Sequence, residues 1–508
     1  MKKVKVRFAP SPTGPLHLGG VRTALYNYLF AKRYQGDFIL RIEDTDQERF
    51  VPGAEGYILK ALQWCGIEPD EGPSYGGNYG PYRQSERKEI YKSHIEQLLK
   101  TGHAYHAFDT PEVLETLREA AHLQGQVFTY NARIREQLDN ALNLHSEEVA
   151  ERLARGLPHV IRFKTPISQP LKLHDEIRGQ ISVDTRTLDD KILVKSDGMP
   201  TYHLANVIDD HLMRISHVIR GEEWLPAMPI HLLLYRAFGW ETPQFAHLPL
   251  ILKPEGKGKL SKRDGDRLDF PVLPLRWKDP HSGAISQGYR DAGYFSEAFI
   301  NMIALLGWNP GGEQELFSLE SLIKKFSLEK VNKSGAHFSK EKAQWFNQQY
   351  LQQKPLEELT SLFSQELKKH KIYAENHYVQ RVVEAIRDRA HFIHEIWDQS
   401  IYFFIPPDSY EEKAVKKAWR PDTASYLDQL KDLLQATENF TANHLRENIQ
   451  VFVKARQLSF GRLMQPLRLA LVGALYGADV FFIMEMLGRQ ESTQRLTRLC
   501  KVLSTSKH

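Results

Sequence analysis

A loop of prolines and glycines near the N-terminus is the densest group of residues that could do chemistry. It reads Ala9-Pro10-Ser11-Pro12-Thr13-Gly14-Pro15-Leu16-His17-Leu18-Gly19-Gly20. Gly19 and Gly20 remove side chains where a ligand can lie against backbone at a helix N-terminus, which is a natural site for anions. Gly14 and Gly19 have Walker A spacing, but Gly20-Val21 follows in place of the required Lys and Ser or Thr. The loop therefore predicts a nucleotide site whose positive charge comes from elsewhere.

A second loop could supply that charge. It reads Lys257-Gly258-Lys259-Leu260-Ser261-Lys262-Arg263 and follows an apolar stretch, 247–252, predicted as a strand. Phosphoryl and nucleotidyl transfers depend on positioning and on cations that meet the charge developing on phosphate, a role open to Lys259 and Lys262. A basic run by itself is more often a solvated surface, so this interpretation depends on the first loop.

The elements around the first loop must position it. Apolar spacing predicts a strand over 4–9, a helix over 21–34 that ends before Gly36, and a second strand over 38–42. In such a βαβ unit, ligands bind beyond the carboxyl ends of the strands. We therefore expect the chemistry to gather near residues 9–20 and 43–46.

The rest of the chain shows an insertion and then a helical region. A polar, helical stretch over 111–143 and β-like stretches at 160–164 and 188–194 lie between two halves of a sheet domain. Further predicted elements are strands at 201–207 and 217–219, a helix at 229–238, a loop insertion at 271–290, and helices from about 295 onward. No role for the 271–290 insertion follows from its residues.

Composition excludes several classes of protein. With 42% hydrophobic and 26% charged residues in 508, the chain is not disordered, collagenous or membrane-embedded. Cys65 and Cys500 lie far apart and form no CxxC pair, which excludes a disulfide scaffold or a four-thiolate zinc site. The N-terminus alternates charge with Val, and the apolar runs are too short to span a bilayer. We expect a cytoplasmic protein that does not bind membranes.

The net charge of +4 conceals an uneven distribution. Residues 452–508, here called the basic tail, carry nine Lys or Arg against three Asp or Glu, a net charge of +6, so the remaining chain carries −2. Cations clustered on one terminal domain are typical of contact with a phosphate backbone, although part of such a cluster can be solvated helix surface.

Four further motifs accompany the two loops in order along the chain. They read Arg7-Phe8-Ala9-Pro10-Ser11-Pro12-Thr13-Gly14, Leu40-Arg41-Ile42-Glu43-Asp44-Thr45-Asp46, Asp197-Gly198-Met199-Pro200-Thr201-Tyr202 and Val218-Ile219-Arg220-Gly221-Glu222-Glu223-Trp224-Leu225. With His17–Gly20 and Lys259–Arg263, they resemble the successive motifs of bacterial glutamyl-tRNA synthetases, which are class I aminoacyl-tRNA synthetases. The helical tail at Gln465–Ala470 and Gly473 also resembles that family, so the match covers nearly the whole chain.

The resemblance implies an α/β fold, with a Rossmann-like parallel-sheet catalytic domain, an inserted α+β domain and all-helical C-terminal domains. The expected boundaries are 1–110 and 196–294 for the two catalytic halves, 111–195 for the inserted acceptor-stem-binding domain, 295–375 for a stem-contact domain and 376–508 for an anticodon-binding domain. It also implies tRNA(Glu), glutamate and ATP with Mg²⁺ as partners, and a monomer.

The resemblance also assigns roles to individual residues. It implies that Arg7 and Arg220 bind carboxylates, a task for which the planar guanidinium suits better than an ammonium, and that Glu43 binds the α-ammonium of glutamate. Beside them it places Ser11, the backbone of Ala9 and the hydroxyl of Tyr202. The implied ATP residues are His17, Gly19, Gly20, Glu223, Ile251, Lys259, Ser261 and Lys262, among which His17, Lys259 and Lys262 are catalytic.

The sequence departs from its relatives at one metal site. Many relatives hold zinc in the inserted domain, but Ala107 and Asp109 stand where thiolates are expected, and Ile134 occupies a further ligand position. We therefore expect no zinc, and interpret His103 and His106 as surface or packing residues.

Three alternatives remain to be weighed. An inactive RNA-binding paralogue is disfavoured by the intact motifs. An adenylyl-transferring relative that charges something other than a full tRNA is disfavoured by the helical C-terminal region. Glutaminyl-tRNA synthetase usually ends in β-barrels, which disagrees with the helical periodicity after residue 295. The resemblance further implies that tRNA binds before glutamate is activated, but the sequence leaves open whether tRNA(Gln) is also charged.

Overall fold

The computed structural model describes residues 3–256 and 258–505. The chain divides into two compact units, Met1–Phe346 (unit 1) and Asn347–His508 (unit 2). None of the helices in the described ranges is both long enough and apolar enough to cross a membrane. The finer division into five domains stays a prediction.

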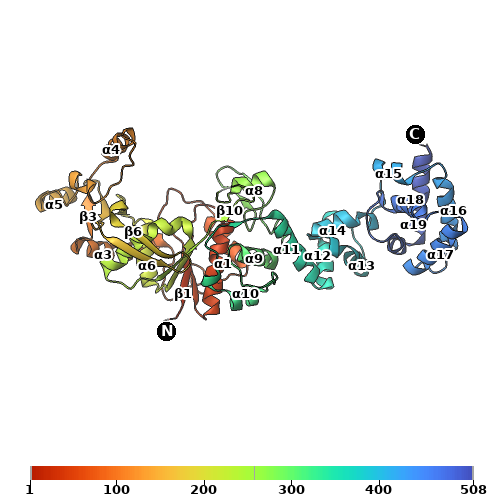
Figure 1. The fold of residues 1–508 in the computed structure, drawn as a ribbon, viewed down its shortest axis with the longest axis horizontal. Helices are drawn as coiled ribbons and strands as arrows, with labels where there is room; N and C mark the ends of the chain where they lie inside the picture. Colours follow the sequence, from red (N-terminus) through yellow and green to blue (C-terminus); the bar gives the residue numbers. More distant parts are fainter. Residues whose placement is uncertain (1–2, 257, 506–508) are drawn as a thin grey trace. The chain divides into compact units, whose positions relative to one another are not determined.

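Unit 1 begins with the βαβ unit that the sequence predicts. This unit consists of β1 (Lys5–Phe8), α1 (Leu18–Arg33) and β2 (Asp37–Leu40), and the helices α2 (Ala54–Trp64) and α3 (Lys88–Lys100) follow it. The fully buried β1 pairs in parallel with β2, with Val6 opposite Phe38. Gly36 allows the chain to pass from α1 into β2 close to β1, because a side chain at this position would overlap the Val4 carbonyl. Figure 1 shows α1 in red beside β1.

The inserted region contributes strands to two sheets. Its elements are β3 (Ala104–Ala107), α4 (Pro111–Leu123), α5 (Ser146–Ala154), β4 (Val160–Phe163), β5 (Pro170–Asp175), β6 (Gly179–Asp184) and β7 (Ile192–Val194). One sheet has the order β3-β4-β7, and a four-stranded sheet has the order β6-β5-β9-β8. The hairpin of β5 and β6 thus extends the sheet of the second catalytic half, which the sequence pattern did not predict.

The second half of unit 1 supplies the remaining elements. They are α6 (Tyr202–Leu212), β8 (His217–Gly221), α7 (Met228–Phe238), β9 (Gln244–Leu248), β10 (Ile251–Leu252), α8 (Lys262–Leu268), β11 (Trp277–Lys278), β12 (Ile285–Ser286), α9 (Ser296–Leu305), α10 (Leu319–Lys325) and β13 (Ala336–His337). β8 and β9 are parallel. The N–H of Ser216 donates to the Lys5 carbonyl oxygen (2.9 Å), which brings the start of β8 beside β1.

One predicted strand is wrong, because residues 201–207 begin the helix α6. Within this segment the buried stretch Leu204–Val207 is only four residues long, so its periodicity does not distinguish a strand from a helix. The predicted loop at 271–290 contains the short antiparallel pair of β11 and β12. This pair packs on α2, where the Tyr57 hydroxyl donates to the Leu275 carbonyl oxygen (2.6 Å).

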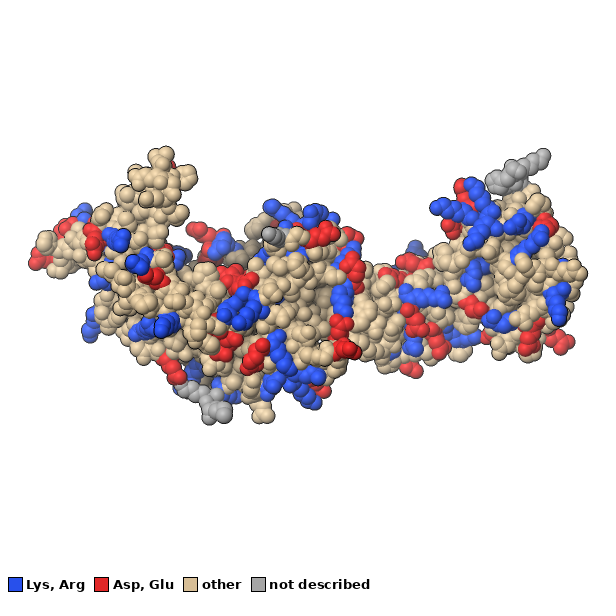
Figure 2. Space-filling model, viewed as in Figure 1, with Lys and Arg blue, Asp and Glu red and all other residues tan. Residues whose placement is uncertain are grey.

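In the described part of unit 2, every named element is a helix, as predicted. Entered through α11 (Lys340–Gln353), it comprises α12 (Leu356–Lys369), α13 (Asn376–Ile386), α14 (Ile393–Ser400), α15 (Glu412–Ala418), α16 (Thr423–Ala436), α17 (Ala442–Ala455), α18 (Phe460–Val472) and α19 (Val480–Thr505). Figure 2 shows Lys and Arg side chains gathered over α15 and the C-terminal end of α19.

Candidate active site

His17 caps the N-terminus of α1 and carries an unused donor. Its Nδ1 accepts from the Gly19 N–H (3.3 Å), so the ring proton lies on Nε2. Nε2 is buried without a hydrogen-bond partner among the described residues. Burial, and then the charge of Lys259, lowers the pKa of His17 to about 4. The ring is therefore neutral at physiological pH and offers one N–H at the helix N-terminus, as a site for phosphate requires.

The two glycines of this turn differ in their surroundings. A side chain on Gly20 would come within 2.6 Å of Leu16 Cδ1, so it would require the Leu16 side chain to move. A side chain on Gly19 would meet only His17 Nδ1, at 3.9 Å. The open backbone that a nucleotide could approach is therefore that of Gly19.

Ala9 and Ser11 lie beside Glu43 because backbone bonds join the two loops. The Arg41 N–H donates to the Phe8 carbonyl oxygen and the Glu43 N–H to that of Pro10, each at 3.0 Å. Ser11 is exposed and Ala9 half-buried. Residues 9–11 and 43 therefore meet at the carboxyl ends of β1 and β2, where the sequence predicts the site.

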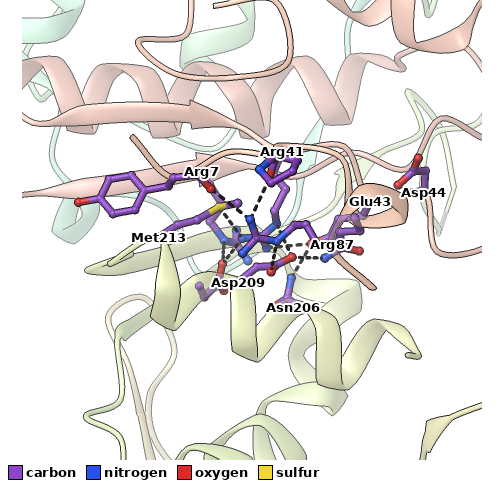
Figure 3. Close-up of polar contacts among 12 residues, drawn as sticks. Arg7, Arg41, Glu43, Asp44, Arg87, Asn206, Asp209 and Met213 are labelled. Carbon is purple, nitrogen blue, oxygen red and sulfur yellow. Dashed lines mark hydrogen bonds and ion pairs between the residues drawn. The ribbon is translucent and has the colours of Figure 1, made fainter. Parts of the chain in front are cut away.

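A buried network of arginines and carboxylates lies beneath these loops (Figure 3). Arg7 Nε donates to Asp210 Oδ1 (3.0 Å), an oxygen that also accepts from Arg41 (2.8 Å). Arg41 in turn pairs with Glu43 (2.9 Å). The Arg7 terminal nitrogens form no hydrogen bond with the described residues, so this end of the guanidinium is open to a ligand while Asp210 fixes the other end.

Glu43 is almost completely buried and receives two donors on one oxygen. Asn206 Nδ2 (2.8 Å) and an Arg41 Nη (2.9 Å) both donate to Oε1. Burial raises the pKa of Glu43 above its ordinary value, although Arg41 and Arg7 act in the opposite direction. Its second oxygen makes no hydrogen bond within the described residues, and an ammonium group is the kind of ligand that a buried carboxylate binds.

Sequence reasoning missed the polar face of α6. Asn206, Asp209 and Asp210 follow Tyr202 at helical spacing, so all four lie on one face. A helix assignment for this segment would have been the signal that finds them. Asp209 anchors a second cluster, because it accepts from Arg87 (2.7 Å), Gln84 (2.9 Å) and Tyr91 (2.8 Å).

Arg220 at the end of β8 lies among neutral groups. It is 5% exposed, and its donors reach the Tyr202 hydroxyl (2.8 Å), His247 Nε2 (3.0 Å), His231 Nδ1 (3.4 Å) and the Trp224 carbonyl oxygen (3.3 Å). No carboxylate in the described residues forms an ion pair with it. Burial raises the pKa of Tyr202 to about 12, so its hydroxyl remains protonated. A buried guanidinium without a direct anionic partner is prepared to bind one.

The residues predicted to bind ATP come from the start of α1, from the segment after β8, from β10 and from the N-terminus of α8. Lys259 Nζ is 2.7 Å from Glu223 Oε1, so two of the predicted ATP contacts pair with each other. Ile251 is buried in β10. Ser261 caps α8, with its N–H donating to Asp264 Oδ2 (3.0 Å) and its hydroxyl to the same oxygen. The side chain of Lys262 lies outside the described residues.

Asp109, at one of the positions where relatives have a zinc ligand, is held by hydrogen bonds. The Asp109 carboxylate accepts from the Tyr130 hydroxyl (2.8 Å) and from the Asp139 N–H (2.9 Å). His106 packs on the ring of His159, with 4.9 Å between centroids. Within the described ranges, no three His, Cys, Asp or Glu side chains come together as a metal site. The absence of zinc stays a prediction.

Comparisons with known proteins agree over nearly the whole chain. Residues 3–345 match the family described as tRNA synthetases class I (E and Q), catalytic domain, and residues 355–500 match an anticodon binding domain. Glutamate–tRNA ligases of Christiangramia forsetii and Flavobacterium psychrophilum are 55% and 54% identical, over 99% of this chain and 99% and 100% of theirs.

Two solved structures are similar over nearly the same length. A glutamate tRNA ligase from Elizabethkingia meningosepticum, described in complex with its amino acid, has a TM-score of 0.97 at 53% identity, covering 99% of this chain and 100% of that one. The glutamate-tRNA synthetase of Elizabethkingia anophelis has a TM-score of 0.94 at 53% identity, covering 98% and 100%. The chain therefore belongs to the glutamate–tRNA ligases, within the class I (E and Q) aminoacyl-tRNA synthetases.

Proposed function

We propose that the cluster around Arg7, Glu43 and Arg220 binds glutamate, and that the two loops beside it bind ATP. The chain is an ATP-dependent glutamate–tRNA ligase, so its site must hold two carboxylates, one ammonium and a triphosphate. The observation that carries the assignment is the buried Arg220 guanidinium, which no carboxylate of the described chain contacts.

The donors and acceptors match glutamate group by group. Arg7 and Arg220 each hold one carboxylate, Glu43 holds the α-ammonium, and the Tyr202 hydroxyl donates to a carboxylate at its edge of the pocket. Ser11 and the Ala9 backbone border the α-amino group. Glutamate supplies the anion that the buried Arg220 lacks.

ATP binds along the start of α1. His17 Nε2–H and the first-turn amides beside Gly19 and Gly20 meet the phosphates and the adenine edge. The ribose contacts Glu223, and Ile251 borders the base. Binding separates Glu223 from Lys259, which then reaches the triphosphate with Ser261 and Lys262. Mg²⁺ enters with ATP and is held largely by the phosphates, whose charge it helps to neutralise.

The reaction requires no protein nucleophile. An oxygen of the glutamate α-carboxylate attacks the α-phosphorus, and pyrophosphate leaves. A hydroxyl of the terminal ribose of tRNA then attacks the acyl carbon, and AMP leaves. The residues lower the barrier by aligning carboxylate and phosphate, and by meeting the charge on phosphorus with His17, Lys259 and Lys262.

Replacement of Arg220 tests the proposal. Truncating one partner of a buried charged pair costs about 2–5 kcal/mol, so we expect Arg220→Ala to raise the KM for glutamate at least about 30-fold while the KM for ATP changes little. The assay is ATP–pyrophosphate exchange with tRNA present. An unchanged KM for glutamate would remove Arg220 from the site.

The tRNA partner and the assembly are tested separately. We propose tRNA(Glu) as the substrate, a monomer as the active form and the cytoplasm as its location. Charging of purified tRNA(Glu) and tRNA(Gln) decides whether the enzyme discriminates between them. Exchange with and without tRNA tests whether tRNA must bind first, and light scattering measures the mass in solution.

A further inference from the structure

Arg220 is the first member of a chain of buried side chains in which His247 contacts Arg220 and Asp175 contacts His247. Its Nε donates to His247 Nε2 (3.0 Å), and His247 Nδ1 lies 2.7 Å from Asp175 Oδ2. Both His247 and Asp175 have 0% exposure. His247 belongs to β9, next to β8, whereas Asp175 ends β5 in the inserted region. The three side chains thus form a line across the sheet toward the glutamate site.

The hydrogen bonds decide the protonation of each member. Asp175 Oδ1 accepts from the N–H groups of Ile177 (3.0 Å) and Arg178 (2.8 Å), and Oδ2 accepts from the His247 N–H (3.1 Å). Burial alone would raise the pKa of Asp175, but the His247 ring and these N–H groups hold it below its ordinary value. Asp175 is therefore a carboxylate that can only accept.

His247 then has a single tautomer. Because Asp175 accepts, Nδ1 must donate, and the lone pair of Nε2 faces the Arg220 Nε–H. Burial lowers the pKa of His247, with Asp175 acting in the opposite direction, so the ring is neutral. A protonated or inverted ring would place N–H against N–H.

The hydrogen bond from Arg220 Nε to His247 Nε2 fixes the plane of the guanidinium. With Nε held by His247, the terminal nitrogens of Arg220 lie on the side of Tyr202 and of the Trp224 carbonyl oxygen. The β5–β6 hairpin is also tied to the end of β8, because Arg178 pairs with Glu222.

We propose that Asp175 and His247 are positioning residues that set the orientation in which Arg220 binds a carboxylate of glutamate. The inserted region thereby contributes to recognition of the amino acid. This inference rests on the proposed role of Arg220.

Two amides distinguish positioning from packing at His247. In His247→Asn, the side-chain N–H₂ can replace Nδ1 as the donor to Asp175, but nothing replaces Nε2, and the Arg220 Nε–H stays buried without an acceptor. In His247→Gln, the longer side chain can place its oxygen near the former Nε2 and accept from Arg220. H247N therefore removes the hydrogen bond to Arg220 and keeps the one to Asp175, whereas H247Q keeps the bond to Arg220 and removes the one to Asp175.

The measurement is ATP–pyrophosphate exchange with tRNA, at temperatures below the melting point of every variant. We expect H247N to raise the KM for glutamate about 5- to 100-fold, as an unpaired buried donor predicts, with kcat and the KM for ATP nearly unchanged. H247Q should recover most of that loss. Asp175→Asn, which leaves the ring in place, should raise the same KM because its amide opposes the donors that the carboxylate accepts.

His174 provides a matched control, since it precedes Asp175 on β5 but is exposed. His174→Asn should leave all constants unchanged.

Equal losses in H247N and H247Q, parallel rises in the KM values for ATP and glutamate, or an unchanged KM for glutamate in D175N would each overturn the positioning role. If Arg220→Ala raises the KM for glutamate and H247N does not, only this inference fails. If Arg220→Ala has no effect, the proposed function of Arg220 fails first.

Discussion

Replacing Asp209 by Asn tests how much the buried cluster around Asp209 stabilises unit 1. Asp209 accepts from Arg87 through Oδ1, and from Gln84 and Tyr91 through Oδ2, and it is completely buried. An asparagine has one acceptor oxygen, so in either orientation its N–H₂ opposes a donor that the carboxylate accepted. Its neutrality also leaves the Arg87 charge without an anion.

The structure sets the size of the effect. Removing one member of a buried ion pair costs about 3–5 kcal/mol. Arg87 keeps its bonds to the carbonyl oxygens of Tyr79 (3.1 Å) and Pro81 (2.9 Å), so we expect the lower end of that range. For a unit spanning Met1–Phe346, a loss of about 3 kcal/mol lowers the melting temperature by about 4 °C.

Differential scanning calorimetry at one scan rate measures this shift. The control is Asp184→Asn, which removes an exposed pair with Arg186 and should shift the transition by less than about 1 °C. Adding Arg87→Met to D209N removes the unpaired charge and should recover part of the loss. A D209N transition within about 1 °C of wild type, or a double variant that melts below D209N, would show that the Asp209–Arg87 pair does not stabilise unit 1.

Three other outcomes are expected. Lys262→Ala should slow adenylate formation, measured by pyrophosphate exchange, much more than it weakens tRNA binding in a filter assay; equal losses would contradict the assignment of Lys262. The pKa of Glu43 is raised, and its carboxylate is the form expected to bind glutamate. Affinity for glutamate should therefore be complete above this pKa and be lost as the pH falls through it, and the loss should occur at a higher pH than an ordinary Glu would give. Glu43→Gln should weaken glutamate binding and flatten the profile of KM against pH. Gly19→Ala should raise the KM for ATP without lowering the melting temperature, since its side chain would meet only His17 at 3.9 Å; an unchanged KM would show that ATP does not approach this backbone.

The basic tail illustrates what net charge does not reveal. Arg495 is 2% exposed and donates to the carbonyl oxygens of Tyr402 and Leu471, each at 2.7 Å. Arg468 donates to that of Ala478 (2.7 Å), and Arg489 to that of Thr437. All three bond to backbone carbonyl oxygens within unit 2, and Arg495 is buried, so not all of the +6 is available to a phosphate backbone.

From the amino-acid sequence alone we could recognise the first βαβ unit, the two loops, the helical C-terminal region and the family. These features depend on local spacing and on residues consecutive in the chain, such as the N-cap His17 and the glycines after it. Local patterns of this kind can be recognised without knowing what lies opposite them.

The pairing of the cations in the site, in contrast, is visible only in the folded chain. Arg7 meets Asp210, 203 residues away, and Arg220 reaches Asp175 through His247 across three strands. The apolar run in α6 is too short for its spacing to indicate a helix, so the polar face of α6 could not be predicted from the sequence. A buried charge is stable only with partners, and the fold brings those partners from distant parts of the chain.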